Sequence, residues 1–283
     1  MNKNKDIRDS LINIAYTVDV QGQGATQFIN QLCASVFSIK KNKKPTEKIK
    51  VHIFYGNIIE QVIISLNSIK SDDFDIVFRK ISKSDLEFMQ KFTKQQPNSQ
   101  ARAWCGIVYA RLWLPKLMND VDRCLYLDSD TLVRGSVQEL FDSDLKGKCY
   151  GMIMGCIPEY GYNSGVMVMD LKRLRELNLW NDMVEHMRLH AYTYMLPDQT
   201  VINRFFKDEI TELPLKYNYP PYTDRYRNAT GDCDSAVIWH FYNGGTKPYA
   251  FVESDWCKVE WNQYLFDADK TMRKNQEAKS VTE

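Results

Sequence analysis

The chain has 283 residues and a formal net charge of +1, from 37 Lys and Arg against 36 Asp and Glu. This balance excludes the basic excess expected of a nucleic-acid-binding protein, and no apolar run reaches the roughly 18 residues of a membrane span. Seven scattered cysteines without a Cys-x-x-Cys pair favour a reduced, cytoplasmic setting.

The first half of the chain alternates between short apolar runs and helical patterns. Such alternation is typical of a mostly parallel sheet with helices on both faces. The expected strands are residues 11–17, 50–55, 75–79 and 123–127, and the expected helices are 27–39, 58–69, a short helix capped by Ser84 with Glu87 in a capping box, and 101–114, which Pro115 ends.

The second half is less regular. The expected strands are residues 149–154, 165–169 and 237–240, and the expected helices are 171–177, 181–190 and 198–206. No linker or repeat interrupts the chain, which predicts one α/β domain over residues 1–250 and a C-terminal extension over 251–283 that packs on it. The aromatic residues of this extension suit weak contact with a membrane surface, whereas the acidic residues between them favour packing; they are Trp256, Trp261, Tyr264 and Phe266.

The segment around Asp128 is the first candidate for chemistry. An apolar strand runs into Asp128-Ser129-Asp130, and side chains two apart on an extended chain face the same way. Two carboxylates at the carboxyl end of a strand, where open α/β sheets bind ligands, suit Mg²⁺ or Mn²⁺. Two other interpretations stay open: an ordinary turn, and a haloacid-dehalogenase-like phosphatase with Asp128 as nucleophile and Asp130 as acid and base.

Further segments accompany this motif in a characteristic order. They are Tyr-Ala-Arg-Leu at 109–112, Asn-Ser-Gly at 163–165, where a turn feeds a strand, Leu-Pro-Asp-Gln at 196–199, His-Phe at 240–241, and Gly-Gly-Thr-Lys-Pro at 244–248. Together they resemble glycosyltransferase family 8. The resemblance implies a GT-A nucleotide-diphospho-sugar transferase fold and a retaining transfer of a hexose, glucose or galactose, from a UDP-sugar to a glycan or other hydroxyl acceptor.

The resemblance also implies a cation site. Asp128, Asp130 and His240 would hold Mn²⁺, or Mg²⁺, with diphosphate oxygens in the remaining positions. Carboxylates combined with an imidazole suit Mn²⁺, and the cation would neutralise charge as UDP departs. Lys247 would add a second positive charge on the diphosphate, with Gly244 or Gly245 allowing close backbone approach.

The remaining roles that the resemblance implies concern the donor and the reaction. Arg111 would clamp the donor and the metal-site carboxylates, Asn163 and Asp198 would hydrogen-bond sugar hydroxyls, and Gln199 would lie near the anomeric carbon. Asp19 would accept from uracil and Ser129 would contact the donor. The Asn-Tyr pair that usually follows Asp19 is replaced here by residues 20–24, so no residue is assigned to stack on uracil.

Each residue also has a purely structural interpretation. Asp198 suits a helix cap, Arg111 a solvated helix position, Asn163 a turn, and His240 a packed histidine. A phosphatase would need a further acidic pair, for which residues 231–234 are the nearest candidate. A sugar-nucleotide-binding protein without turnover is the third functional class. The acceptor cannot be derived from these residues, and cell-surface glycan assembly at the inner face of the membrane is an expectation from the family alone.

Overall fold

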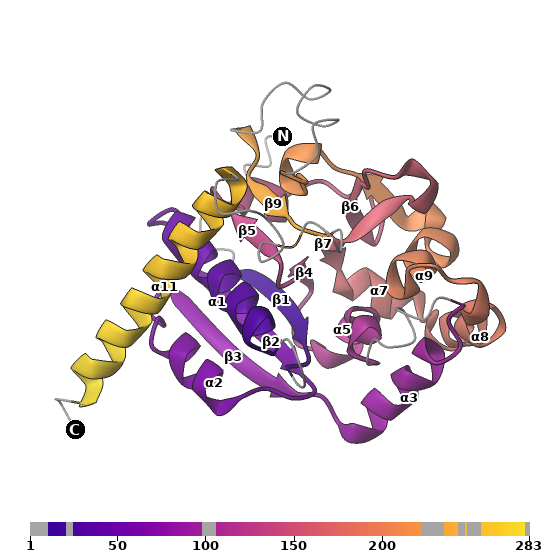
Figure 1. Ribbon diagram of the computed structural model, residues 1–283. Helices are drawn as coiled ribbons and strands as arrows, with labels where there is room; N and C mark the ends of the chain where they lie inside the picture. Colours follow the sequence, from indigo (N-terminus) through magenta and orange to yellow (C-terminus); the bar gives the residue numbers. More distant parts are fainter. Residues whose placement is uncertain are drawn as a thin grey trace.

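The computed structural model describes residues 11–20, 25–97, 106–221, 235–242, 247 and 256–280. Within these ranges a seven-stranded sheet has helices on both faces (Figure 1). Most neighbouring strands are parallel, and β7 runs antiparallel to β4 and β6. In spatial order the strands are β3 Phe74–Lys80, β2 Ile49–Tyr55, β1 Ile12–Val18, β4 Arg123–Leu127, β7 Tyr162–Asp170, β6 Tyr150–Met154 and β8 Ile210–Glu212. The predicted mostly parallel mixed sheet is confirmed.

The pleat of the central strands divides the apolar residues between two cores. On β1, Ile14 and Tyr16 face one core and Ala15 faces the other. The first core lies under α1 Ala25–Asn42, α2 Glu60–Asn67 and α11 Trp256–Ser280 (Figure 1). The second lies under α3 Lys83–Thr93, the 3₁₀ helix η1 Gly106–Trp113, α5 Leu114–Leu117, α7 Leu171–Leu177, α8 Trp180–His190 and α9 Pro197–Phe205. Burial on both faces explains why apolar residues predominate in the central strands β1 and β4.

A second, two-stranded sheet crosses the carboxyl end of β4. Strand β5 Thr131–Val133 pairs antiparallel with β9 Ile238–His240, so that Thr131 lies opposite His240. The next amide, of Phe241, donates to the carbonyl of Asp130 over 3.0 Å. This pairing brings a histidine from late in the chain beside the two mid-chain aspartates.

The long helix α11 packs along α1 and α2 (Figure 1). Its residues Trp261, Tyr264, Ala268 and Met272 are buried, whereas Phe266 is 62% exposed. Two of the four aromatic residues considered for membrane contact therefore serve packing; the side chain of Trp256 is not described. Among the described helices, none combines the length and the apolar character required to cross a bilayer. The expected domain boundary near residue 250 lies outside the described residues and stays a prediction.

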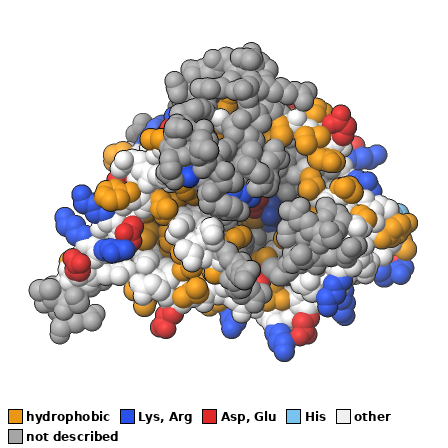
Figure 2. Space-filling view, viewed as in Figure 1, with side chains coloured by type: hydrophobic (Ala, Val, Ile, Leu, Met, Phe, Trp, Pro, Cys, Tyr) orange, Lys and Arg blue, Asp and Glu red, His pale blue; other side chains and the backbone are white. Residues whose placement is uncertain are grey.

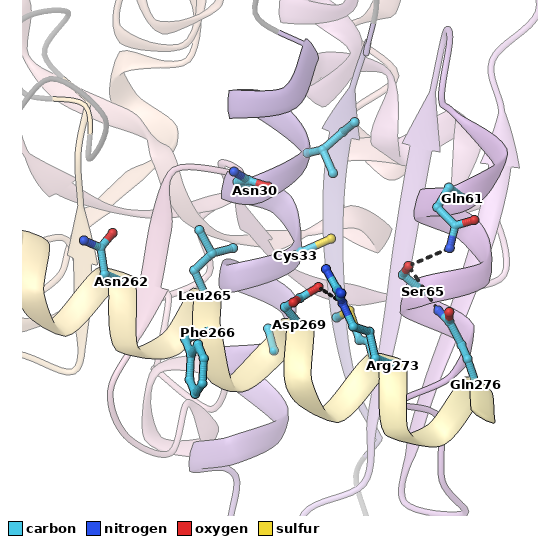
Figure 3. Close-up of a pocket in the computed structure, with 13 residues that line it drawn as sticks. Asn30, Cys33, Gln61, Ser65, Asn262, Leu265, Phe266, Asp269, Arg273 and Gln276 are labelled. Carbon is cyan, nitrogen blue, oxygen red and sulfur yellow. Dashed lines mark hydrogen bonds and ion pairs between the residues drawn. The ribbon is translucent and has the colours of Figure 1, made fainter. Parts of the chain in front are cut away.

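A cavity of about 720 Å³ separates parts of α11 from α1 and α2 (Figure 3). Arg273 of α11 forms an ion pair with Asp269 over 2.9 Å. Gln276 of α11 and Gln61 of α2 both donate to Ser65 Oγ, over 3.2 and 3.5 Å. The residues predicted to form the site do not line this cavity.

Some local predictions were wrong. Ser82, not Ser84, caps α3, since its hydroxyl accepts from the Asp85 amide over 3.1 Å. Pro115 does not end a helix; it lies in the first turn of α5, where a missing amide hydrogen has no consequence. The segment 106–113 is a 3₁₀ rather than an α-helix. The short strands β5 and β8 were not predicted, because three residues are too few to show a period.

Candidate functional site

The three expected metal ligands converge at the end of β4. One ligand atom each from Asp128, Asp130 and His240 lies within 4.8 Å of the others. His240 Nε2 is 3.2 Å from Asp130 Oδ1 and 3.8 Å from Asp128 Oδ2. The chain between the aspartates is not extended as predicted: the Thr131 amide and hydroxyl both turn back to the Asp128 carbonyl, over 3.2 and 2.8 Å. The turn interpretation and the metal-site interpretation thus describe the same residues.

The donor set fits a divalent cation. His240 is 1% exposed, and its Nε2 atom makes no hydrogen bond within the described part of the chain, although it points at two carboxylates. An unpartnered buried nitrogen beside two carboxylate oxygens is an arrangement that Mn²⁺ satisfies.

Gly165 on β7 gives the cluster its space. A Cβ at this position would lie 2.0 Å from His240 Cε1 and 2.7 Å from Asp128 Oδ2. Any other residue would therefore displace the imidazole or the carboxylate. The turn expected to lead into the strand at Gly165 is absent from the structure, because Asn163 and Ser164 already lie within β7, where the register with β6 shifts.

Lys247 lies against the cluster and contacts the Asp130 carboxylate. Burial alone would raise the pKa of Asp130, but the positive charge of the adjacent Lys247 opposes it, and the pKa lies well below its usual range. Asp130 is therefore ionised and able to act as a ligand. The predicted Gly244 and Gly245 lie outside the described residues, and Ser129 is buried at 8% exposure between the two aspartates.

Arg111 on η1 joins the cluster to Asp198. Its Nη2 lies 2.9 Å from Asp128 Oδ1, its Nε lies 3.1 Å from Asp198 Oδ2, and its Nη1 donates to the Ser164 carbonyl over 2.7 Å. Burial would lower the pKa of Arg111, but Asp128 and Asp198 raise it above its ordinary value. Arg111 is therefore a buried cation, not the solvated helix arginine of the structural interpretation.

The aromatic ring of Tyr126 packs against the guanidinium of Arg111. The ring centroid lies 4.5 Å from the Arg111 Cζ atom, and the hydroxyl donates to Asp128 Oδ1 over 2.8 Å. Thr17 on β1 lies 3.0 Å from the same hydroxyl. The strand β4 thus supplies both a metal-site carboxylate and the aromatic face on which its arginine partner lies.

Asp198 and Gln199 lie in the first turn of α9, buried at 7% and 6% exposure. Leu196 holds the N-cap position, so the interpretation of Asp198 as the cap was wrong. Asp198 accepts from Ser164 Oγ over 2.7 Å. Burial raises its pKa, and Arg111 opposes this only in part.

Gln199 is held at both ends of its amide. Its Oε1 accepts from Asn163 Nδ2 over 3.2 Å, and its Nε2 donates to the Tyr160 carbonyl over 3.0 Å.

Asp19 lies at the end of β1, where its Oδ1 accepts from the amide and the side chain of Asn57, each over 2.8 Å. The structure thus gathers most of the predicted residues into one buried network.

Reasoning from the sequence missed Tyr126, Ser164, Gly165 and Asn218 as members of this network. Asn218 is 2% exposed and binds both His240 and Asn163. The sequence places it between Tyr217 and Tyr219, and neither neighbour indicates a particular chemistry. Figure 2 shows basic and acidic side chains interspersed over the described part of one face, and some of each lie in a recess near its centre.

Comparisons with known proteins identify the family and the fold of this chain. A model of the family "Glycosyl transferase family 8" matches residues 20–252. The chain is 29% identical over 181 residues to glycosyltransferase GlyF of Streptococcus pneumoniae serotype 4, covering 56% of this chain and 45% of that protein. It is 24% identical over 269 residues to the lipopolysaccharide 1,2-glucosyltransferase of Escherichia coli K12, covering 84% and 72%. The match also covers 60% of a putative glycosyltransferase of Haemophilus influenzae and 59% of glycosyltransferase GlyB of Streptococcus pneumoniae, so the chain spans about half the length of several curated relatives.

Solved structures show the fold. An active-site mutant of LgtC superimposes with a TM-score of 0.73 at 20% identity, covering 90% of this chain and 96% of that one. The galactosyltransferase LgtC in complex with donor and acceptor sugar analogs gives 0.69 at 21% identity, with the same coverage. The GT-A fold and the family resemblance drawn from the sequence motifs are confirmed.

Proposed function

Because this chain belongs to glycosyl transferase family 8, we propose that it transfers a hexose, glucose or galactose, from a UDP-sugar to a hydroxyl of a glycan or other acceptor, with Mn²⁺ and with retention at the anomeric carbon. The observation that carries the proposal is the convergence of Asp128, Asp130 and the unpartnered Nε2 of His240 at the carboxyl end of β4. That edge of an α/β sheet is where nucleotide ligands bind.

The proposed cation would be held by these three residues and would neutralise negative charge on the departing UDP. Mg²⁺ prefers oxygen ligands, whereas the imidazole of His240 favours Mn²⁺. Lys247 contacts Asp130 in this structure, and we expect its ammonium to turn to the diphosphate when the donor binds. Such a movement exchanges one anionic partner for another and leaves no buried charge unpaired.

Arg111 would fix the geometry of the reacting region. It ties Asp128 of the metal site to Asp198 of α9, so that the cation site and the residues facing the sugar keep a fixed spacing. Asp198 and Asn163 would then bind sugar hydroxyls, and Asp19 would accept from uracil. Fixed polar groups of this kind lower the barrier without reorganising during the reaction.

Retention usually depends on a carboxylate nucleophile beneath the anomeric carbon. Here Gln199 is an amide, and the Asp198 carboxylate is bound by Arg111 and Ser164. We therefore propose front-side displacement. The bond from the anomeric carbon to the phosphate oxygen breaks as the acceptor oxygen bonds on the same face, and the departing phosphate takes the acceptor proton. A glycosyl adduct trapped on Asp198 or Gln199 would contradict this mechanism.

The test is release of UDP from UDP-glucose and from UDP-galactose, with and without an acceptor. We expect Mn²⁺-dependent release with one donor, stopped by EDTA. Binding of the donor without any release would instead support a sugar-nucleotide-binding protein. The family match argues against the phosphatase alternative, whose expected second acidic pair at residues 231–234 lies outside the described residues. Since one relative is a lipopolysaccharide glucosyltransferase, we include cell-surface glycan assembly at the cytoplasmic face of the membrane in the proposal.

A further inference from the structure

A continuous row of buried side-chain amides leads from His240 to the residues of α9. His240 Nδ1 lies 2.8 Å from Asn218 Oδ1, and Asn218 Nδ2 donates to Asn163 Oδ1 over 3.0 Å. Asn163 Nδ2 then donates to Gln199 Oε1 over 3.2 Å. All four side chains are at most 8% exposed. Such a closed row leaves little freedom for any member to rotate.

The backbone determines the direction of every hydrogen bond in this row. The amide of Gly165 can only donate, and it lies 3.0 Å from Asn163, so the Asn163 atom facing it is the acceptor Oδ1. The Asn218 atom that shares Oδ1 must then be the donor Nδ2, which turns Asn218 Oδ1 toward His240. An oxygen accepts, so His240 carries its proton on Nδ1. The neutral ring therefore directs the Nε2 lone pair at Asp128 and Asp130.

This tautomer is the less favourable one for an isolated cluster. Nε2 lies 3.2 Å from Asp130 Oδ1, and a proton on Nε2 would form a charge-assisted hydrogen bond to that carboxylate. Such a proton would occupy the position that a cation needs. Asn218 opposes it, because an Nδ1 without a proton would place two lone pairs against each other at 2.8 Å.

We propose that Asn218 is a positioning residue that holds His240 in the Nδ1-protonated tautomer, so that Nε2 is free to bind a divalent cation together with Asp128 and Asp130. This inference rests on the proposed function for the identity of the cation. It extends that function in one respect: through Asn163, the same row of amides sets the position of Gln199, so the metal ligand and a residue facing the donor share one support. Partners that orient a ligating histidine change metal affinity by about 10- to 100-fold.

The chain contains a natural comparison for this pair. His52 on β2 is 1% exposed, and its Nε2 lies 3.0 Å from Asn13 Oδ1. Asn13 Nδ2 donates to the Leu11 carbonyl over 3.3 Å, which turns its oxygen to the ring. His52 therefore carries its proton on Nε2, the opposite nitrogen from His240. One spectrum can record both tautomers.

The experiment measures imidazole ¹⁵N shifts of the full chain in EDTA near pH 8, where an ordinary imidazole is neutral. The sequence has only 4 histidines, and the His240→Asn spectrum identifies the signal of that ring. We expect Nδ1–H for His240 and Nε2–H for His52. Asn218→Leu should move His240 toward Nε2–H and weaken Mn²⁺ binding, measured by calorimetry, by about 10- to 100-fold.

Two variants separate positioning from general damage. Asn218→Asp keeps an acceptor for Nδ1–H but loses the donor to Asn163 Oδ1, so the Nδ1–H tautomer of His240 should persist in this variant. Asn13→Leu removes the amide beside His52 and should leave Mn²⁺ affinity unchanged.

An Nε2–H tautomer of His240 in the wild type overturns the inference, as does wild-type Mn²⁺ affinity in Asn218→Leu. If that variant does not fold, the wild-type tautomer and Asn218→Asp still decide. A wild type that releases UDP with Mn²⁺ but shows Nε2–H refutes only the role of Asn218. A wild type that binds no Mn²⁺ refutes the proposed function and the cation-positioning role with it.

Discussion

Replacing Arg111 by Leu should lower the free energy of unfolding by roughly 3–5 kcal/mol, the usual effect of removing one partner from a buried ion pair. The Arg111 side chain is 8% exposed, and it faces the Asp198 side chain, 9% exposed, at 3.1 Å and Asp128 at 2.9 Å. Without the guanidinium, both carboxylates would stay close together in a poorly solvated region, and the Ser164 carbonyl would lose its donor. Urea denaturation in EDTA measures this effect without compensation by a cation.

Two further variants make this test specific. Arg188 forms a similar two-pronged contact with Glu185 at 2.7 and 2.6 Å, but both side chains are more than half exposed. Arg188→Leu should therefore change stability by at most about 1 kcal/mol. Adding Asp198→Asn to Arg111→Leu should recover part of the loss, because one uncompensated charge is removed. An Arg111→Leu variant within about 1 kcal/mol of the wild type would refute the assignment of Arg111 as the buried cation of the site.

Further predictions concern metal, space and pH. Asp130→Ala or His240→Ala should abolish Mn²⁺-dependent UDP release without unfolding the chain; full activity of either in EDTA would contradict the metal site. Gly165→Ala should weaken Mn²⁺ binding at least about 10-fold, because its Cβ would lie 2.0 Å from His240 Cε1; wild-type affinity would show that the cluster tolerates displacement. Burial, with the charges of Arg79 and Lys50, lowers the pKa of His52 from 6.5 to about 4. The unfolded chain therefore binds the proton first, and His52 should lower the free energy of unfolding by up to about 3 kcal/mol between pH 6.5 and 4. Urea titrations should show a smaller loss in His52→Gln, and an equal loss there would contradict this assignment.

The apolar runs of the first half predicted the strands β1 to β4 to within one residue at each end. This accuracy has a physical reason: most residues of β1, β2 and β4 are buried, so apolar residues concentrate in these segments. The helix ends were less accurate, since Ser82 and Ser84 are equally suitable caps and only the local geometry selects the first. Buried strands are therefore easier to predict from a single sequence than the capping residues of helices.

The site residues were reached through a resemblance between motifs, not through composition or period. Nothing in the neighbourhood of Asn218 indicates that it binds His240, because that contact exists only after η5 Leu215–Tyr217 and β9 have packed beside β7. Ser164 and Tyr126 are similar cases: Ser164 binds Asp198 on α9, and Tyr126 contacts Thr17 on β1 and Arg111 on η1. A single sequence shows which residues are suited to chemistry, but not which of them the fold brings into contact.

The pairing of β5 with β9 has a consequence for how the protein is made. A nascent chain released only as far as β7 already carries both aspartates, yet it lacks the imidazole that β9 brings opposite Thr131. Tight capture of Mn²⁺ would then report that the last third of the polypeptide has docked. During refolding, the ion would bind only after β9 has paired with β5. It would therefore slow the dissociation of β9 and leave the rates of the earlier folding steps unchanged.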